Sequence, residues 1–270
     1  MQNPAPAPVL IERFELTLIQ APLLDACGSG DVELAHCLAE SIRVVDRLQG
    51  GYGEDPRLLL SEYRTIGWHA LLRACRGGHL AAAQWAFARF ELDASPLPRG
   101  LATLAFFNAC CSGCVPLVEW VDATCALTGL EAFSRQPSPL ALVCMRNDVP
   151  LAQWIVARFK IQASHNLSDD PFTVACAHGA LAAAKWAAEH FDLSGPEVPD
   201  SEVAFRGNSG CYGPLQVAAR GGHLHVVQWL VTAFGLGKDL ACTGAESPLE
   251  LACLGRHENV TAWLCNHFGL

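Results

Sequence analysis

One pattern of hydrophobic and polar positions recurs along almost the whole chain, and its clearest copy covers residues 212–236. The second half of this copy predicts a helix, because apolar residues recur at spacings of three and four and form one face. The first half is about two helical turns long. It opens with Pro214, which is tolerated at a first helical position. Gly221-Gly222, between the halves, can end a helix. The copy therefore predicts two short helices joined by a tight turn.

The other copies align with this one on a tryptophan, except that the earliest has a cysteine there. The anchor residues are Cys37, Trp85, Trp120, Trp154, Trp186, Trp229 and Trp263. Ten residues before each anchor is a small residue: Cys27, Cys75, Cys110, Cys144, Cys176, Ala219 or Cys253. Seven residues before it is a turn residue, with one exception at the last copy: Gly30, Gly78, Gly113, Asn147, Gly179, Gly222 or Arg256. The chain is therefore a repeat array.

The repeats must stack, because helices this short are not stable alone in water. Each pair buries its apolar face only against its neighbours, which is how a solenoid is built. We therefore expect an all-α solenoid of about seven helix-turn-helix repeats and count it as one domain. The expected repeats lie near residues 21–45, 68–92, 103–127, 137–161, 169–193, 212–236 and 246–270.

The clearest repeat resembles the ankyrin family, whose unit is about 33 residues of turn and two helices. Pro214-Leu215, Ala218-Ala219 and Gly222-His223-Leu224 match that family's signatures in order, and the resemblance extends over residues 21–270. The ending with Trp and Phe-x-Leu is similar to the ankyrin variety of large DNA viruses and protists. The family's histidine after proline-leucine is missing, and here Gln216 stands in its place. The hairpins between repeats are therefore less well predicted than the helix pairs.

Three segments lie outside the repeat pattern. Residues 1–20 begin with alternating prolines and predict a disordered leader, followed by a segment that closes the open end of the stack. The long spacing before Trp85 predicts a loop and a short additional helix around residues 49–60. Residues 194–211 form a second insertion, which is either a disordered spacer or a functional loop.

Composition favours a chain that stays in a reducing, cytoplasmic compartment, which would be the host cytoplasm if the protein is viral. The chain has 13 cysteines, and six of them occupy one repeat position, where cysteine acts as a small buried residue. The net charge of −9 argues against general binding to nucleic acid or to anionic membranes. Residues 101–118 are uncharged, but they keep the repeat register and predict a buried helix pair rather than a membrane span.

Candidate chemistry is weak throughout the chain. A redox reading of Cys111-x-x-Cys114 requires a thiolate at a helix N-terminus, whereas Cys111 is expected at a C-terminal end. A zinc site commonly requires a second such pair, and the sequence has none. His79, His223 and His257 share one repeat position, where helix capping or hydrogen bonding is expected. We therefore predict no enzyme, no metal and no cofactor.

The remaining prediction concerns a surface. In the ankyrin family, partners usually bind the concave side, over the turns and the exposed ends of the first helices. The residues expected there form a modestly basic stripe: Arg76, Met145, Arg146, His178 and Arg220. The resemblance implies a non-catalytic module that binds a partner protein, and one version of it is an adaptor. The stripe could also be ordinary solvated arginines. The alternative function is a self-associating structural or particle-packaged protein, although a monomer is expected.

Overall fold

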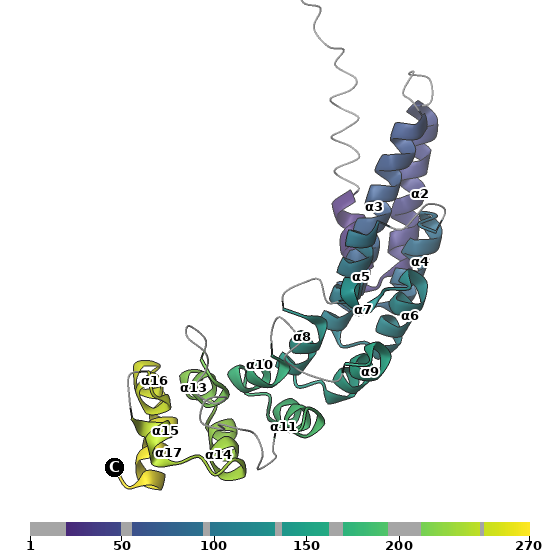
Figure 1. Ribbon diagram of the computed structural model, residues 1–270. Helices are drawn as coiled ribbons and strands as arrows, with labels where there is room; N and C mark the ends of the chain where they lie inside the picture. Colours follow the sequence, from purple (N-terminus) through teal and green to yellow (C-terminus); the bar gives the residue numbers. More distant parts are fainter. Residues whose placement is uncertain are drawn as a thin grey trace, which may run out of the picture. The chain divides into compact units, whose positions relative to one another are not determined.

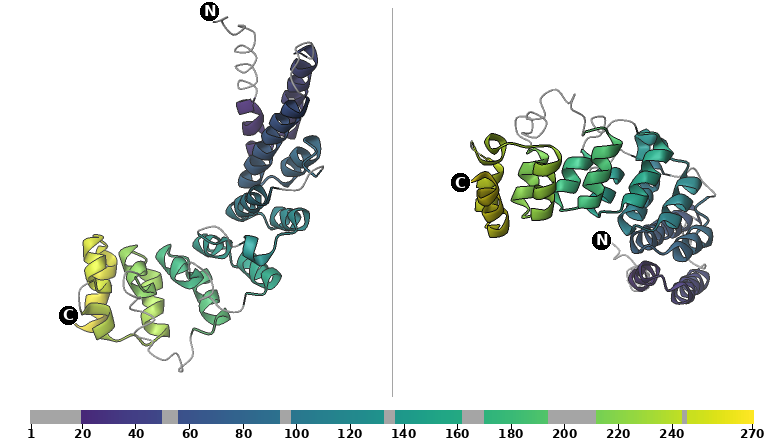
Figure 2. Two further views of the ribbon diagram at one scale, coloured as in Figure 1. Left: turned by 45° about the horizontal axis from the view of Figure 1, so that its top comes forward. Right: turned by 90° about the horizontal axis from the view of Figure 1, so that it is seen from below.

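Helix pairs make up the part of the chain that the structure describes (Figures 1 and 2). The computed structural model describes residues 20–49, 56–93, 98–132, 137–161, 170–193, 212–243 and 246–270, and none of these is in a β-strand. The chain divides into two compact units, residues 1–132 and 133–270. The predicted leader and the 194–211 insertion lie outside the described residues, apart from residue 20, which is helical.

The first unit begins with a helix that covers residues 20–29. Its later helices are α2 (Val32–Gln49), α3 (Pro56–Gly77), α4 (Leu80–Arg89), α5 (Arg99–Ser112), α6 (Val115–Cys125) and α7 (Gly129–Ala132). Helix α3 packs against α4 and α5, and α5 packs against α6. In the second repeat, the first helix, α3, therefore contacts both its own second helix and the first helix of the next repeat.

The long spacing before Trp85 is not filled as predicted. Instead of a separate short helix, α2 extends to 18 residues and α3 to 22 residues, while residues 50–55 of the predicted loop lie outside the described residues. Helix α3 begins at Pro56. Proline is tolerated there because a backbone N–H at the first helical position has no intrahelical acceptor. The prediction was wrong because the apolar run at residues 58–60 was assigned to a separate element, whereas it continues into the first helix of the second repeat.

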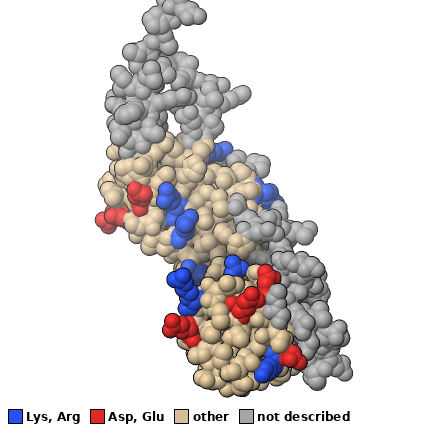
Figure 3. All heavy atoms as spheres, turned by 90° about the vertical axis from the view of Figure 1, so that its left-hand side faces the viewer, with Lys and Arg blue, Asp and Glu red and all other residues tan. Residues whose placement is uncertain are grey.

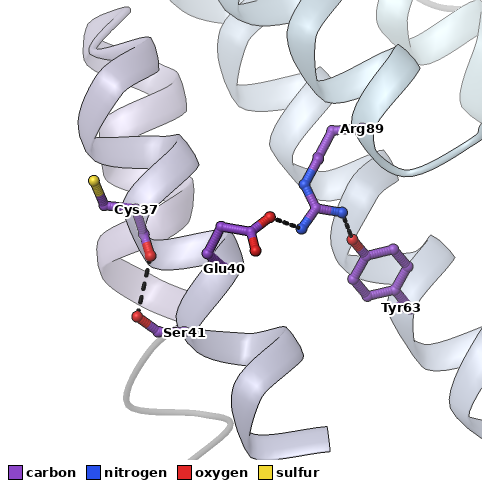
Figure 4. Close-up of polar contacts among 5 residues, drawn as sticks. All are labelled: Cys37, Glu40, Ser41, Tyr63 and Arg89. Atoms are coloured by element: carbon purple, nitrogen blue, oxygen red, sulfur yellow. Dashed lines mark hydrogen bonds and ion pairs between the residues drawn. The ribbon is translucent and has the colours of Figure 1, made fainter. Parts of the chain in front are cut away.

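A polar cluster joins helices α2, α3 and α4 of this unit (Figure 4). The Arg89 guanidinium, in α4, donates to the Tyr63 hydroxyl of α3 and pairs with Glu40 of α2 at 3.0 Å. The Arg89 side chain is 12% exposed and that of Glu40 is 48% exposed. In α2, the Ser41 hydroxyl donates to the Cys37 carbonyl at 3.0 Å. A partly exposed ion pair contributes about 0–1 kcal/mol, so its main effect is to fix the position of α2.

The second unit contains four helix pairs and one extra short helix. They are α8 (Pro139–Met145), α9 (Val149–Phe159), α10 (Pro171–Ala177), α11 (Leu181–His190), α13 (Pro214–Arg220), α14 (Leu224–Ala233), α15 (Lys238–Cys242), α16 (Pro248–Leu254) and α17 (Glu258–Phe268). Every first helix here has seven residues and begins with proline. The side chains of Ser138, Asp170 and Ser247 cap three of them. The sequence did not predict α7 or α15.

The turn inside each repeat has a left-handed residue at the predicted position. The φ angles are +81° at Gly30, +81° at Gly78, +77° at Gly113, +61° at Asn147, +71° at Gly179, +74° at Gly222 and +57° at Arg256. This conformation costs a residue with a Cβ roughly 1–2 kcal/mol. Asn147 compensates, because its Oδ1 accepts a hydrogen bond from the Ala183 amide of the next repeat at 2.9 Å.

The core consists of the small residues that the repeat pattern identified. The predicted small position is buried in six repeats, and in the last repeat Cys253 is exposed. That prediction was wrong for Cys253, because the described residues contain no further helix pair against its side of α16. Of the seven tryptophans, Trp68 is buried in the first helix α3, and the six anchor tryptophans all lie on second helices and are half-buried. Two contact the preceding repeat: Trp120 meets Phe87 with ring centroids 5.7 Å apart, and Trp229 meets Phe172 at 6.2 Å.

Candidate partner-binding face

The five predicted site residues lie at the C-terminal ends of first helices. Arg76 is in the last turn of α3, Met145 and Arg220 end α8 and α13, and Arg146 and His178 are the C-caps of α8 and α10. All are exposed except Met145, which is half-buried. Cationic side chains are favourable there because the last carbonyls of a helix carry partial negative charge. We call these five residues, together with Leu254 at the end of α16, the turn ridge.

The structure brings four of the predicted residues together in one compact unit. Met145, Arg146, His178 and Arg220 belong to the second unit, where α8 packs against α10 and α10 packs against α13. Arg76 belongs to the first unit. Leu254 follows in the next repeat, since α13 packs against α16, and its side chain is 72% exposed. The ridge of the second unit is therefore a row of mostly exposed side chains at the C-terminal ends of its first helices.

Arg220 is held in place by residues that the sequence analysis missed. Its guanidinium lies over the Tyr212 ring, 5.2 Å from the centroid. The Tyr212 hydroxyl donates to Glu246 Oε1 at 3.0 Å, and Gln216 Nε2 donates to the Glu246 carbonyl at 2.9 Å. The hydrogen bond to the Glu246 carboxylate raises the pKa of Tyr212. A partial signal for this cluster existed, because Gln216 and Arg220 are four residues apart on α13, but Tyr212 precedes that helix and its contact does not follow from the helix period.

Charge is sparse and local on this protein. On the described part of the face drawn in Figure 3, basic and acidic side chains form small groups on a surface that is mostly uncharged. In the described residues, Arg220 has no carboxylate within ion-pair distance, whereas Arg89 in the first unit pairs with Glu40. The nearby Glu250 carboxylate accepts from the Glu246 amide at 2.7 Å, at the opposite end of its helix from Leu254. The ridge therefore presents an unneutralised guanidinium.

Histidines just behind the ridge connect neighbouring repeats. His223 Nε2 bonds to the Ala177 carbonyl of the preceding repeat at 3.0 Å. His257 Nε2 bonds in the same way to the Arg220 carbonyl at 2.8 Å. His225 Nε2 adds a bond to the Gly179 carbonyl at 2.9 Å. His79, His223 and His257 occupy N-cap positions, but none makes a side-chain cap hydrogen bond. Of the two roles predicted for them, capping by the side chain is not observed, and hydrogen bonding is confirmed for His223 and His257.

The rings of His223, His79 and His257 each lie so close to two glycines that a Cβ on either glycine would clash with the ring. A Cβ on Gly221 would lie 2.7 Å from His223 Cδ2, and a Cβ on Gly179 of the preceding repeat would lie 2.6 Å from His223 Nδ1. His79 and His257 have glycines at the same two places: Gly77 and Gly30 for His79, Gly255 and Gly222 for His257. We call this arrangement the histidine lock. It requires glycine two residues before the histidine, which is a position on the turn ridge.

Repeats without the lock have side chains at that ridge position. Where the histidine is replaced by Cys114, Asp148 or Ala180, the residue two places earlier is Ser112, Arg146 or His178. In the described repeats, a ridge side chain at this position and a histidine lock do not occur together. Two of the predicted site residues, Arg146 and His178, therefore stand where the lock is absent.

Protonation of His223 is disfavoured by its burial. Burial lowers the pKa of His223, while its bond to the Ala177 carbonyl raises it, and the neighbouring rings of His225, His178 and His257 lower it further. A second proton on His223 would sit at Nδ1, which lies against Gly179, whereas Nε2 faces the Ala177 carbonyl. The neutral imidazole of His223 is thus the form that fits between the repeats.

The cysteines are placed as structural residues. Burial raises the pKa of Cys27 to about 11, and it raises the pKa values of Cys75 and Cys144 to about 12. Cys111 lies in the last turn of α5, so the helix dipole disfavours a thiolate there, as predicted. Among the described residues, no group of three or more His, Cys, Asp or Glu side chains is arranged to hold a metal ion. No described helix is both long and apolar enough to cross a membrane.

Comparison with known proteins identifies the fold. The ankyrin repeat domain of human ASB11 matches with a TM-score of 0.50 and 19% sequence identity, over 90% of this chain and 97% of that domain. The chain therefore has an all-α, ankyrin-like solenoid fold, as the repeat pattern predicted. No protein-family model matches the sequence, and a search of curated proteins finds no match.

Proposed function

We propose that this protein is a non-catalytic module that binds a partner protein along the turn ridge, on the concave side of its first helices. One observation carries the proposal. Repeats 4 and 5 lack the histidine lock and carry Arg146 and His178 at the position that the lock reserves for glycine. The histidine lock stabilises the stack, so we expect a repeat that lacks it to have another role for the residue at that position. Departures from local structural rules concentrate at functional sites.

The chemistry of the ridge supports protein recognition. Arginine and tyrosine are enriched among residues that dominate binding energy at interfaces. Arg220 is already ordered over Tyr212, so less side-chain entropy is lost when it binds. Met145 adds a flexible thioether that adapts to different surfaces. In this proposal the partner is a protein, and neither nucleic acid nor a membrane is its ligand, since the net charge is −9.

Position-specific photo-cross-linking tests the proposal. A photoreactive amino acid replaces Arg146 or Arg220 on the ridge, and Lys185 or Glu189 on the exposed side of α11 as matched controls. We expect the ridge positions to capture a defined protein in the native cell and the α11 positions to capture none above background. Equal capture from both sets would contradict binding along the ridge.

We further propose an adaptor role and a reducing, cytoplasmic location. The adaptor version needs a second surface or a further domain that contacts other machinery. The buried thiols with raised pKa values support the location, since they are kept as thiols in a reducing compartment. The similarity of the Trp and Phe-x-Leu ending to ankyrin repeats of large DNA viruses and protists stays a prediction of the sequence.

A self-associating structural or particle-packaged protein is the second candidate. The observation that favours it is the last repeat, where Leu254 and Leu270 are exposed apolar side chains, 72% and 57% accessible. Such side chains could meet another copy of the chain. Light scattering at two protein concentrations separates the candidates, because a mass that stays at 28.9 kDa excludes stable self-association.

A further inference from the structure

We infer that the partner of the turn ridge is an extended protein segment in which a carboxylate lies three residues from an aliphatic side chain. The carboxylate binds Arg220 and the aliphatic side chain binds Leu254. This inference rests on the proposed function and adds the chemistry and spacing of the bound segment. It depends on the contacts of α13 and α16 alone, within one compact unit.

The acidic residue of the segment follows from the state of Arg220. Arg220 is exposed, its guanidinium lies over the Tyr212 ring, 5.2 Å from the centroid, and it has no carboxylate within ion-pair distance among the described residues. A guanidinium fixed in this way presents its N–H groups in the planar fork that matches a carboxylate. The other charged or titratable side chains at this end of the helices are Arg256, His178, His223 and His257, together with one exposed carboxylate, Glu258 at the start of α17, which makes no ion pair with Arg220.

The nearby acidic residues do not occupy this position. Glu246 accepts from Tyr212, and Glu250 accepts from the Glu246 amide, so both carboxylates are engaged at the N-terminal end of α16. Helix α16 has seven residues, which separates that end from Leu254 by about 10 Å. A carboxylate that approaches Arg220 from the ridge side therefore meets attraction rather than repulsion.

The aliphatic residue of the segment follows from Leu254. It occupies in the last repeat the place that Arg220 occupies in the preceding one, nine residues before the tryptophan. Its side chain is 72% exposed, whereas burial of a leucine side chain away from water is favourable. An aliphatic side chain from a partner would cover it, with the charged ridge as the polar rim.

The spacing follows from the packing of α13 against α16. Packed helices lie about 8–10 Å apart. An extended chain rises about 3.3 Å per residue, so it crosses one repeat in about three residues. The segment is therefore Glu-x-x-Leu or Leu-x-x-Glu, or the same with Asp, Ile or Val, according to the direction in which it runs.

Fluorescence anisotropy with labelled twelve-residue peptides tests this inference on the full chain. The peptides carry Glu-x-x-Leu or Leu-x-x-Glu in a glycine and serine background. Controls replace Glu by Gln or Lys, replace Leu by Ser, or place Glu and Leu next to each other. We expect at least one of the first two to bind, and each change to weaken binding at least fivefold.

Charge exchange identifies the contact. We expect Arg220→Glu to lose the glutamate peptide and to bind the lysine peptide instead. Leu254→Ser should weaken the Leu peptide and leave the Ser peptide unchanged. Arg158→Glu, on an exposed position of α9, is the matched control and should bind like the wild type. Circular dichroism and thermal unfolding verify that each variant folds.

Several results would overturn the inference. These are failure of both peptides to bind the wild type, equal binding of the lysine or adjacent-residue peptides, and unchanged binding by Arg220→Glu. A wild-type dimer that Arg220→Glu dissociates would show that a second copy of this chain occupies the site, and would also overturn it. In each case cross-linking from Arg146 still decides separately whether the ridge binds a partner protein.

Discussion

The histidine lock makes a prediction about Gly221, which lies two residues before His223. Replacing this glycine by alanine normally stabilises a protein, because the backbone here has φ −81°, which any residue can adopt. Lower entropy of the unfolded chain would contribute about 0.4–1 kcal/mol. In this structure, however, the new Cβ would lie 2.7 Å from both Cδ2 and Nε2 of His223. The ring must move, so the substitution acts on the lock.

The magnitude follows from the contacts that the ring would lose. Its bond to the Ala177 carbonyl has a length of 3.0 Å, and a hydrogen bond of this kind contributes about 0.5–1.5 kcal/mol. Overpacking a closely packed site costs about 1–3 kcal/mol. After subtraction of the entropic gain, Gly221→Ala should lower the free energy of unfolding by roughly 1–3 kcal/mol.

A double-mutant cycle isolates this effect. In His223→Ala the ring is gone, and the nearest remaining contact of a Cβ at 221 is the Ala177 carbonyl, at 3.1 Å. Gly221→Ala should then be neutral or stabilising by up to about 1 kcal/mol. Urea unfolding followed by tryptophan fluorescence gives the four free energies. Gly100→Ala, which meets nothing within 4 Å, is the matched control and should stabilise both backgrounds. An equal effect of Gly221→Ala in both backgrounds would refute the lock.

Three further predictions concern stability and thiol reactivity. Burial lowers the pKa of His223, so the unfolded chain binds this proton first as the pH falls below the ordinary value of 6.5. The unfolding free energy should therefore decrease between pH 7.5 and 5.5, and it should decrease less in His223→Gln. Asn147→Ala should destabilise the protein more than Asn147→Gly does, by about 1–2 kcal/mol. Both variants lose the hydrogen bond to the next repeat, but only alanine is strained at φ +61°. Equal urea midpoints of the two variants would contradict this. A thiol reagent at pH 8 should modify exposed Cys37 within minutes and spare Cys75 until the chain unfolds, because burial raises the pKa of Cys75 to about 12.

The repeat pattern predicted most of the fold because each repeat presents the same requirements. A left-handed turn needs glycine or asparagine, and the position ten residues before the tryptophan needs a small side chain. Periodicity exposes such requirements even in a single sequence. It also fails where a repeat departs from the rule: Arg256 takes the left-handed turn without being glycine, and Cys253 is exposed.

The contacts between repeats could not be predicted from the sequence. Periodicity describes one helix pair at a time, so the positions of the site residues at first-helix ends followed from it. The bond from His223 to the preceding repeat did not, because it joins residues 46 positions apart. The stacking of Arg220 on Tyr212 depends on side-chain rotamers and also required coordinates. The glycine requirement of the lock became visible only when the rings had been placed.

Charge reversal along the ridge tests the central claim most directly. The variant Arg76→Glu, Arg146→Glu, Arg220→Glu changes only exposed side chains at first-helix ends. The control carries the same reversal at three exposed basic residues away from the ridge: Arg158, Lys185 and Lys238. Calorimetric titration with the partner identified by cross-linking should show affinity lost at least tenfold in the ridge variant and kept in the control. Unchanged affinity in a folded ridge variant would contradict the assignment of the ridge as the binding surface.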